Sequence, residues 1–218
     1  MFGRWVVTLS IAAIYFSATA CGGSYHVVRS AEPNPFSCRA GFVVAPITYE
    51  GLEVGKKTET EYLSDKSEET RRDWDADKKA MGREFSRSLI QNAAHKGIRI
   101  DASTTPGAAG HFVIQPRVGF VEPGFFGGPA MHSSEVRMTV VIQSPDGRPL
   151  DEIRMENETL GSIAYPSTRS RFERDGEKLG ESLAEYLNGR VIPSRGRHGA
   201  RDGACRVARN DPAGAGQR

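Results

Sequence analysis

The pattern of hydrophobic and polar positions predicts one long helix in the first half of the 218-residue chain. The stretch "SEETRRDWDADKKAMGREFSRSLIQNAAHKG" covers residues 67–97 and carries charged residues opposite one apolar stripe. Apolar residues recur along the stripe at spacings of seven and four: Trp74, Met81, Phe85, Leu89 and Ala93. This spacing is typical of an amphipathic helix. Ser67 is a suitable N-cap and Gly97 a suitable C-terminal cap, so we expect the helix to lie between them.

A second amphipathic helix is expected in "SRFERDGEKLGESLAEYLNGRV" at 170–191. Its apolar stripe consists of Phe172, Leu179, Leu183, Tyr186 and Leu187. We expect this helix to end at Gly189, because glycine commonly terminates helices.

Short apolar or alternating runs elsewhere predict strands. Such runs are "GFVVAPITYE" at 41–50, "IRIDA" at 98–102 and "HFVIQPRVGFV" at 111–121. Alternation on both sides of the turn signal Pro145-Asp146-Gly147 indicates a β-hairpin with one polar face. The order strand, helix, three strands, helix predicts a mixed α/β domain, an α+β sandwich. Its sheet would have about four to five strands, with both helices packed on one face.

Residues 1–20 have the pattern of a secretory signal peptide. Arg4 precedes 12 uncharged residues at 5–16, and small residues occupy 17–20. The apolar run is too short for a transmembrane helix, which needs about 20 residues. We therefore expect the chain to be exported.

Cys21 follows directly, and "ATAC" at 18–21 resembles a bacterial lipobox, although leucine is typical at the position of Ala18. In a lipoprotein Cys21 would be the acylated residue and the new amino terminus. Gly22, in place of aspartate, favours delivery to the outer membrane, with the chain held on the periplasmic face by its lipid anchor. The alternative is a soluble periplasmic protein with Cys21 as an odd thiol.

We expect the rest of the chain to comprise a lipid-anchored linker at 21–40, a single α/β envelope domain at 41–192 and a disordered Arg/Gly-rich tail at 193–218. From residue 192 onward six arginines stand against two aspartates, whereas residues 21–191 carry 22 basic and 25 acidic side chains. The basic charge therefore belongs to the tail, and the domain has no evident nucleic-acid footprint.

Cys38 and Cys205 are the other two cysteines of the chain. In an oxidising compartment such a pair is a candidate disulfide, which would fix the tail beside the start of the domain. Two unpaired thiols are the alternative, and the spacing does not decide between them.

The sequence carries no recognised catalytic, metal or cofactor motif. "GLEVGKKT" at 51–58 departs from a phosphate-binding loop, because three residues rather than four separate its glycines and Lys57 stands where a hydroxyl is needed. The five histidines are scattered, without metal-ligand spacing. We therefore expect no metal, no cofactor and no enzymatic activity. An envelope hydrolase with a site assembled across loops is the alternative function.

The segment "VEPGFFGGPAMHSSE" at 121–135 contains large apolar residues among glycines and prolines: Phe125, Phe126 and Met131. One interpretation is a long hairpin connection whose aromatic rings pack back over the sheet. The other is an exposed apolar loop that docks a partner, since aromatic residues and methionine are enriched at interfaces. These three residues are our candidates for partner binding.

Four segments resemble a group of poorly characterised bacterial envelope lipoproteins, over residues 41–192 and the lipobox. They are "ATAC", "FVVAPITYE", "HFVIQPRVGFVEPGFFGGPA" leading into "VRMTVVIQSPDGRPLDE", and "GEKLGESLAEYLNGR". The resemblance implies an anticodon-binding-like α/β domain, similar to the TolB amino-terminal domain, curli-export lipoproteins and penicillin-binding-protein activator lipoproteins. The chain departs from that group in its polar insertion before the first helix and in its tail.

The resemblance also implies a function. Those relatives are assembly, secretion or regulatory components, so it implies a non-enzymatic lipoprotein that binds another envelope protein. A self-assembling secretion accessory subunit, which would be a homo-oligomer, is a further alternative.

Overall fold

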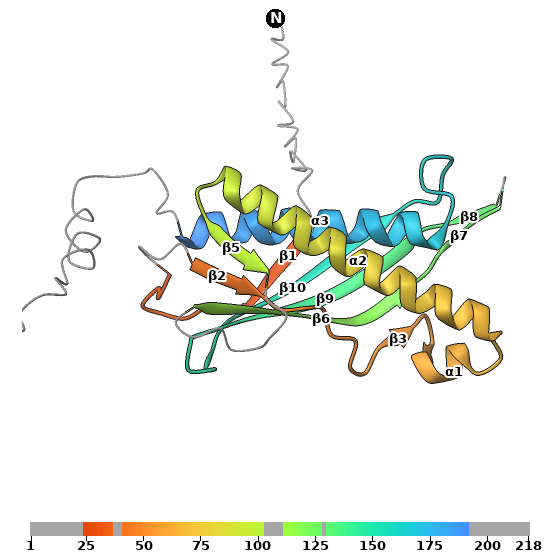
Figure 1. The fold of residues 1–218 in the computed structure, drawn as a ribbon, viewed down its shortest axis with the longest axis horizontal. Helices are drawn as coiled ribbons and strands as arrows, with labels where there is room; N and C mark the ends of the chain where they lie inside the picture. Colours follow the sequence, from red (N-terminus) through yellow and green to blue (C-terminus); the bar gives the residue numbers. More distant parts are fainter. Residues whose placement is uncertain (1–23, 37–40, 103–110, 128–129, 192–218) are drawn as a thin grey trace, which may run out of the picture.

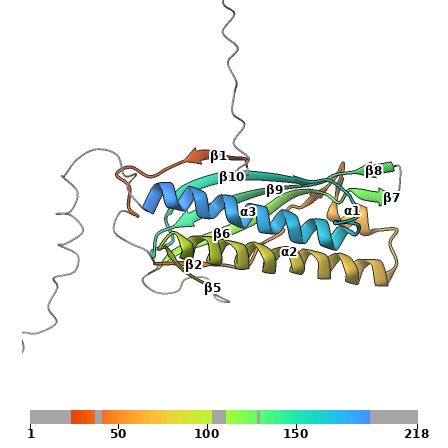
Figure 2. The same cartoon turned by 90° about the horizontal axis from the view of Figure 1, so that it is seen from above.

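The computed structural model describes residues 24–36, 41–102, 111–127 and 130–191. A mixed sheet forms one layer and two long helices form the other (Figures 1 and 2). The strands of the main sheet are β1 (Ser24–Arg29), β2 (Gly41–Val44), β3 (Glu53–Val54), β4 (Lys57–Thr58), β5 (Arg99–Ala102), β6 (Phe112–Glu122), β9 (Ser134–Gln143) and β10 (Pro149–Thr159). The helices are α1 (Glu59–Leu63), α2 (Glu68–His95) and α3 (Thr168–Val191), and a separate hairpin is formed by β7 (Phe125–Gly127) and β8 (Ala130–His132).

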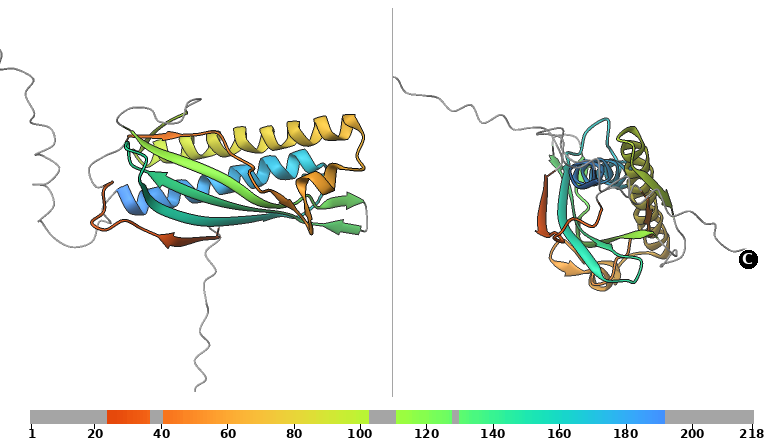
Figure 3. Two further views of the ribbon diagram at one scale, coloured as in Figure 1. Left: turned by 90° about the horizontal axis from the view of Figure 1, so that it is seen from below. Right: turned by 90° about the vertical axis from the view of Figure 1, so that its left-hand side faces the viewer.

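The main sheet mixes parallel and antiparallel pairing. Its strand order is β1-β10-β9-β6-β2-β5, while β3 pairs with the second half of β6, and β4 pairs with β3. β2 runs parallel to β5 and β6, whereas β6, β9, β10 and β1 are joined antiparallel. Seen along the long axis, the strands curve around the helices (Figure 3, right). The predicted mixed α/β class is confirmed, but the sheet has eight strands rather than about four to five.

The additional strands lie in two segments for which we predicted no strand, the linker and the polar insertion before the first long helix. β1 occupies part of the expected linker at 21–40, where it pairs with β10, and the Tyr25 ring packs edge-on against Tyr186 with 5.7 Å between centroids. β3 and β4 have two residues each, within a polar segment. Strands this short contain too few positions to show a period, so the pattern alone does not reveal them.

Helix α2 agrees with its sequence signals. The Ser67 hydroxyl accepts a hydrogen bond from the backbone N–H of Thr70, and Gly97, just past the end of the helix, has φ +75°. The predicted apolar stripe is buried, including Phe85 and Leu89, which are fully enclosed. The caps satisfy backbone groups that the ends of a helix leave free, which is why they mark its limits so well.

Helix α3 buries its predicted stripe as well, but it ends at Val191 instead of at Gly189. Gly189 is an ordinary helical residue and is absent from the positions of positive φ in the described chain. A glycine ends a helix when it adopts the left-handed conformation, which Gly189 does not. The helix continues to Val191, whose side chain is buried.

The two long helices are in backbone contact. A Cβ at Gly180 would lie 2.5 Å from the carbonyl oxygen of Phe85, and a Cβ at Gly176 would overlap the carbonyl oxygen of Met81. The Ser88 hydroxyl also donates to a carbonyl of α3 at 2.7 Å. Glycines four residues apart therefore allow α3 to pack directly on α2.

The β9–β10 hairpin confirms the alternation in its sequence. Side chains of β9 that face the helices are buried, including Val136, Val140 and Ile142, while those between them are half-buried or exposed. The turn contains Gly147 with φ +82°, as a tight connection requires. The polar face of the sheet is turned away from the helices.

A buried carboxylate joins the segment after β1 to the end of α3. Asp151, on β10, is fully buried and accepts hydrogen bonds from the Tyr186 hydroxyl at 2.5 Å, the Arg190 guanidinium at 2.9 and 3.1 Å and the backbone N–H of Ala31 at 2.8 Å. A buried charge is tolerated when it is paired and hydrogen-bonded in this way. The cluster fixes where the amino-terminal segment meets the domain.

Four predictions fall outside the described residues. These are the signal peptide at 1–20, the acylation site Cys21, the Cys38–Cys205 disulfide and the tail at 193–218, all of which stay predictions. Within the described part of the chain, no helix is long and apolar enough to span a bilayer.

Candidate functional site: an apolar tip

Exposed apolar side chains gather at one end of the molecule. Phe125 is 52% exposed and Met131 47%, and both belong to the β7–β8 hairpin. Leu160 is 56% exposed and Ile163 90%, and both lie in the connection between β10 and α3. The hairpin projects beyond the long strands (Figures 1 and 2). We call these four side chains the apolar tip.

The hairpin and the connection are in direct contact. Gly124 begins the hairpin with φ +61°, and a Cβ there would lie 2.5 Å from the carbonyl carbon of Ser133. A Cβ at Gly161 would lie 2.8 Å from the Phe125 carbonyl oxygen and 3.3 Å from Cβ of Phe126. Both positions need glycine because backbone passes too close for a side chain. The two segments are thus in contact, with Phe126 half-buried. Within the hairpin Phe126 pairs with Met131 and Phe125 with His132, so Phe125 and Met131 lie on opposite faces of the tip.

A buried arginine donates hydrogen bonds to the hairpin and to the connection. Arg171, in the first turn of α3, is 1% exposed. Its guanidinium donates to the carbonyl oxygens of Pro123 at 3.1 and 3.3 Å and of Gly124 at 3.2 Å, at the base of the hairpin. It also donates to the carbonyl oxygens of Tyr165 at 3.2 Å and Pro166 at 3.1 Å in the connection. The planar fork of donors suits such a clamp.

A carboxyl group lies one turn further along α3. Asp175 is fully buried and accepts hydrogen bonds from the Ser134 hydroxyl at 2.7 Å, the Asn157 amide at 2.7 Å and the Thr159 hydroxyl at 2.5 Å. Burial raises the pKa of Asp175, while the three hydrogen bonds and the charge of Arg171 oppose that rise. Burial has the opposite effect on a cation and lowers the pKa of Arg171. Arg171 remains charged, because arginine titrates far above neutral pH.

The structure brings together the three residues that we singled out and adds others. Phe125, Phe126 and Met131 do lie in one hairpin, and two of them are exposed. Leu160 and Ile163 were missed, although a leucine and an isoleucine within the Gly, Ser and Pro run at 160–167 were the available signal. Arg171 was missed because nothing in its position distinguishes it from a surface arginine of an amphipathic helix.

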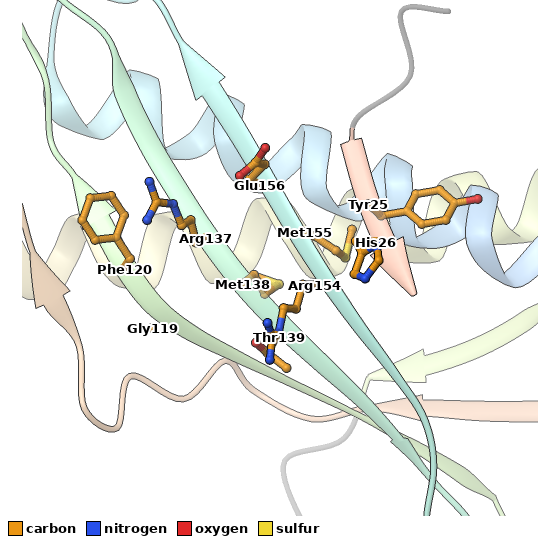
Figure 4. A pocket seen from close by; sticks show the side chains of 10 residues that line it. All are labelled: Tyr25, His26, Gly119, Phe120, Arg137, Met138, Thr139, Arg154, Met155 and Glu156. Carbon is orange, nitrogen blue, oxygen red and sulfur yellow. The ribbon is translucent and has the colours of Figure 1, made fainter. Parts of the chain in front are cut away.

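The polar face of the sheet carries a separate depression of about 340 Å³ (Figure 4). Arg137 lies over the Phe120 ring at 4.3 Å from its centroid and donates to Glu135 at 2.6 Å. His26 and Thr139 line the same depression, but no hydrogen bond joins them to each other within the described chain. A nucleophile needs a base within hydrogen-bond reach, and this surface offers no such pair.

Other marks of catalysis are also missing from the described residues. No group of three or more His, Cys, Asp or Glu side chains is placed there to hold a metal ion. Asp175, whose pKa is raised by burial, lines neither the depression nor two further cavities of about 580 and 640 Å³.

No protein-family model and no curated protein sequence matches the chain significantly. Several solved structures are similar to it at low sequence identity. PelC from Paraburkholderia phytofirmans, a dodecamer, has 9% identity and a TM-score of 0.43, over 74% of this chain and 97% of that one. Protein XCC0632 from Xanthomonas campestris, assigned to family DUF330, has 10% identity and a TM-score of 0.41, over 74% and 92%.

A minor lipoprotein from Acinetobacter baumannii is also similar, with 10% identity and a TM-score of 0.32, over 69% of this chain and 94% of that one. One of these three proteins is thus named as a lipoprotein. The narrower resemblance to anticodon-binding-like domains and to the TolB, curli-export and activator groups stays a prediction. Similarities at these TM-scores carry no inference about function.

Proposed function

We propose that the chain is a non-enzymatic lipoprotein of the cell envelope that binds another envelope protein through the apolar tip. The observation that carries the proposal is the grouping of four exposed apolar side chains on two segments held by one buried arginine. Large apolar side chains that are exposed together at one end of a molecule are unfavourable in water and commonly mark an interaction site. A tip built on a rigid base also loses little conformational entropy when it binds.

The energy available from the tip is moderate. Full burial of a large apolar side chain contributes about 1.5–3 kcal/mol, so covering the exposed parts of these four would contribute roughly 4–7 kcal/mol. Association itself costs at least about 4 kcal/mol. The tip alone therefore supports weak binding, which membrane attachment would strengthen by raising the effective concentration of the two partners.

The proposed attachment point is Cys21, on the periplasmic face of the outer membrane. β1 begins three residues later, at Ser24, and a fully extended chain advances about 3.3–3.6 Å per residue. An acylated Cys21 would therefore hold β1 within about 10 Å of the lipid. Stable anchoring needs two or more acyl chains, which a lipidated amino-terminal cysteine supplies.

The mass of the mature protein extracted from membranes tests the anchor. We expect a chain that begins at Cys21 and carries acyl mass, and we expect this species to disappear when lipoprotein signal peptidase is inhibited. An unacylated mature chain that is unaffected by the inhibitor would instead establish a soluble periplasmic protein.

Photo-crosslinking in the intact envelope tests the tip. A crosslinker placed at Leu160 should give one discrete protein adduct, and Met131→Ser combined with Ile163→Ser should abolish it. Val27→Thr combined with Val28→Thr is the matched control, because these valines are 38% and 41% exposed on β1, outside the tip. An adduct that survives the tip substitutions would refute the proposed binding surface.

The same crosslink distinguishes a partner from self-association. An adduct made of two copies of this chain, together with a native mass above that of the monomer at micromolar concentration, would identify a homo-oligomer. An adduct with a different envelope protein would identify the proposed kind of partner.

A further inference from the structure

A cavity of about 580 Å³ lies between α2 and the carboxyl ends of two parallel strands. Val44 and Ala102 are the last paired residues of β2 and β5, and both line the cavity. In open α/β sheets, ligands commonly bind in the crevice outside the carboxyl ends of parallel strands. The volume falls within the range of about 300–1,000 Å³ that is typical of small-molecule sites.

The interior of this cavity is apolar. Val44, Ile47 and Tyr49 contribute the aliphatic and aromatic surface, and Val44 is 2% exposed. The Tyr49 hydroxyl is turned aside, since it donates to the Lys78 carbonyl oxygen at 2.8 Å. Burial raises the pKa of Tyr49, so the ring stays a neutral phenol. The walls therefore suit a hydrocarbon chain.

The rim of the cavity is positively charged. Its lining includes three cations, Lys78, Lys79 and Arg83, and no carboxylate among the described residues. Lys78 is already neutralised, because its ammonium group lies 2.5 Å from Glu59 and 3.1 Å from Asp75.

The other two cations are available to a ligand. Lys79 and Arg83 have no hydrogen bond or ion pair within the described chain. They lie one helical turn apart, about 5–6 Å between Cβ atoms, where like charges repel each other. A single anionic group placed between them would relieve that repulsion.

We propose that this cavity binds an alkyl carboxylate of fatty-acid type. The carboxylate would lie between Lys79 and Arg83, where arginine offers bidentate hydrogen bonds, and the chain would lie against Val44, Ile47 and Tyr49. The inference is independent of the apolar tip, which lies elsewhere on the molecule. Its success or failure therefore leaves the proposed partner binding untouched.

Calorimetric titration of the full chain tests the site. For this experiment Cys21 is replaced by serine, so that neither an attached acyl group nor detergent competes with the added ligand for the cavity. Decanoate should bind with a stoichiometry of one. Decyltrimethylammonium, which has the same chain and the opposite charge, should bind at least tenfold more weakly, and acetate, which lacks the chain, should give no measurable binding.

Three variants locate the ligand. Lys79→Ala combined with Arg83→Ala should weaken decanoate binding at least tenfold. Gly82→Leu should abolish decanoate binding. Gly82 lines the cavity, and a Cβ at this position would lie 3.9 Å from Cδ1 of Ile47. A larger side chain would therefore extend into the space for the ligand. Arg72→Ala is the control, and decanoate binding to this variant should not change. Arg72 is another exposed arginine on α2, has no ion pair within the described chain and lies outside the cavity.

Thermal melts of each variant show whether the fold is kept. Should Gly82→Leu fail to fold, the charge variants and the reversed-charge probe still decide the question. The proposal is overturned if decanoate shows no saturable binding, if the cationic probe binds equally well, or if the Lys79 and Arg83 substitutions leave the affinity unchanged.

Discussion

Gly180→Ala is expected to destabilise the protein, even though alanine is the better helix former. A Cβ at Gly180 would lie 2.5 Å from the carbonyl oxygen of Phe85 and 2.8 Å from the backbone nitrogen of Leu89. Both atoms belong to the backbone of α2, which cannot rotate aside as a side chain can. The helices would have to separate by about 0.9 Å to restore an ordinary contact of 3.4 Å.

Two opposing effects set the size of this change. Alanine in place of glycine inside a helix stabilises by about 0.8–1 kcal/mol. An extra methyl group forced into a packed core costs about 1–3 kcal/mol, and a gap approaching 1 Å forfeits up to half of the dispersion energy of each contact across it. Because the obstacle is backbone, we place the cost near 3 kcal/mol. The free energy of unfolding should therefore fall by about 2 kcal/mol.

Gly189→Ala is the matched control for this prediction. It makes the same substitution in the same helix, but no atom of the described residues lies within 4 Å of a Cβ at Gly189. Only helix propensity then acts, so the free energy of unfolding should rise by about 0.8–1 kcal/mol. Urea unfolding followed by far-UV circular dichroism measures both variants. Equal stabilisation of the two would show that α2 and α3 are not in backbone contact.

Three further substitutions probe the buried polar groups. Asp175→Asn should flatten the pH dependence of stability. Burial raises the pKa of Asp175, so folding favours its protonated form. The wild type should therefore lose stability as the pH rises from the ordinary aspartate value of about 3.9 through the raised pKa. Urea midpoints across a pH series measure this, and parallel curves for wild type and variant would contradict it. Tyr186→Phe removes the phenol that donates to buried Asp151, so urea unfolding should show a loss of about 1.5–3 kcal/mol, and an unchanged midpoint would mean that the bond contributes nothing. Arg171→Met should cost about 3–5 kcal/mol and speed amide exchange at residues 125–132, measured by mass spectrometry; unchanged exchange there would argue against a clamp on the tip.

The sequence predicts the elements whose signals are local. Ser67 and Gly97 mark the ends of α2 because a cap is made by the residues that flank it. The β9–β10 hairpin is visible because alternation and the turn at Gly147 lie within one continuous segment. The predicted end of α3 was wrong because Gly189 resembles a terminating glycine, whereas the burial of Val191 depends on the rest of the fold.

The features that the sequence does not reveal depend on distant contacts. β1 exists because β10 pairs with it, about 130 residues further along the chain. Gly176 and Gly180 are visible as glycines, but only the nearby backbone of α2 shows why a side chain would not fit. For the candidate site, the aromatic hairpin was predictable from apolar residues among glycines and prolines. Its support by Arg171 was not, because burial of an arginine on carbonyl oxygens leaves no periodic pattern.

Helix α3 connects the two ends that the proposed function requires. Near its start, Arg171 holds the apolar tip; near its end, Arg190 donates to Asp151 and to the carbonyl oxygen of Ala31, behind β1. The separation of about 19 residues between these arginines corresponds to about 28 Å of helix. Backbone contact with α2 stiffens that length, so the position of the tip relative to β1 is set by one supported helix. If Cys21 is the anchor, the reach of the tip from the membrane is a property of α3, and loosening either arginine should weaken partner binding without removing the apolar surface itself.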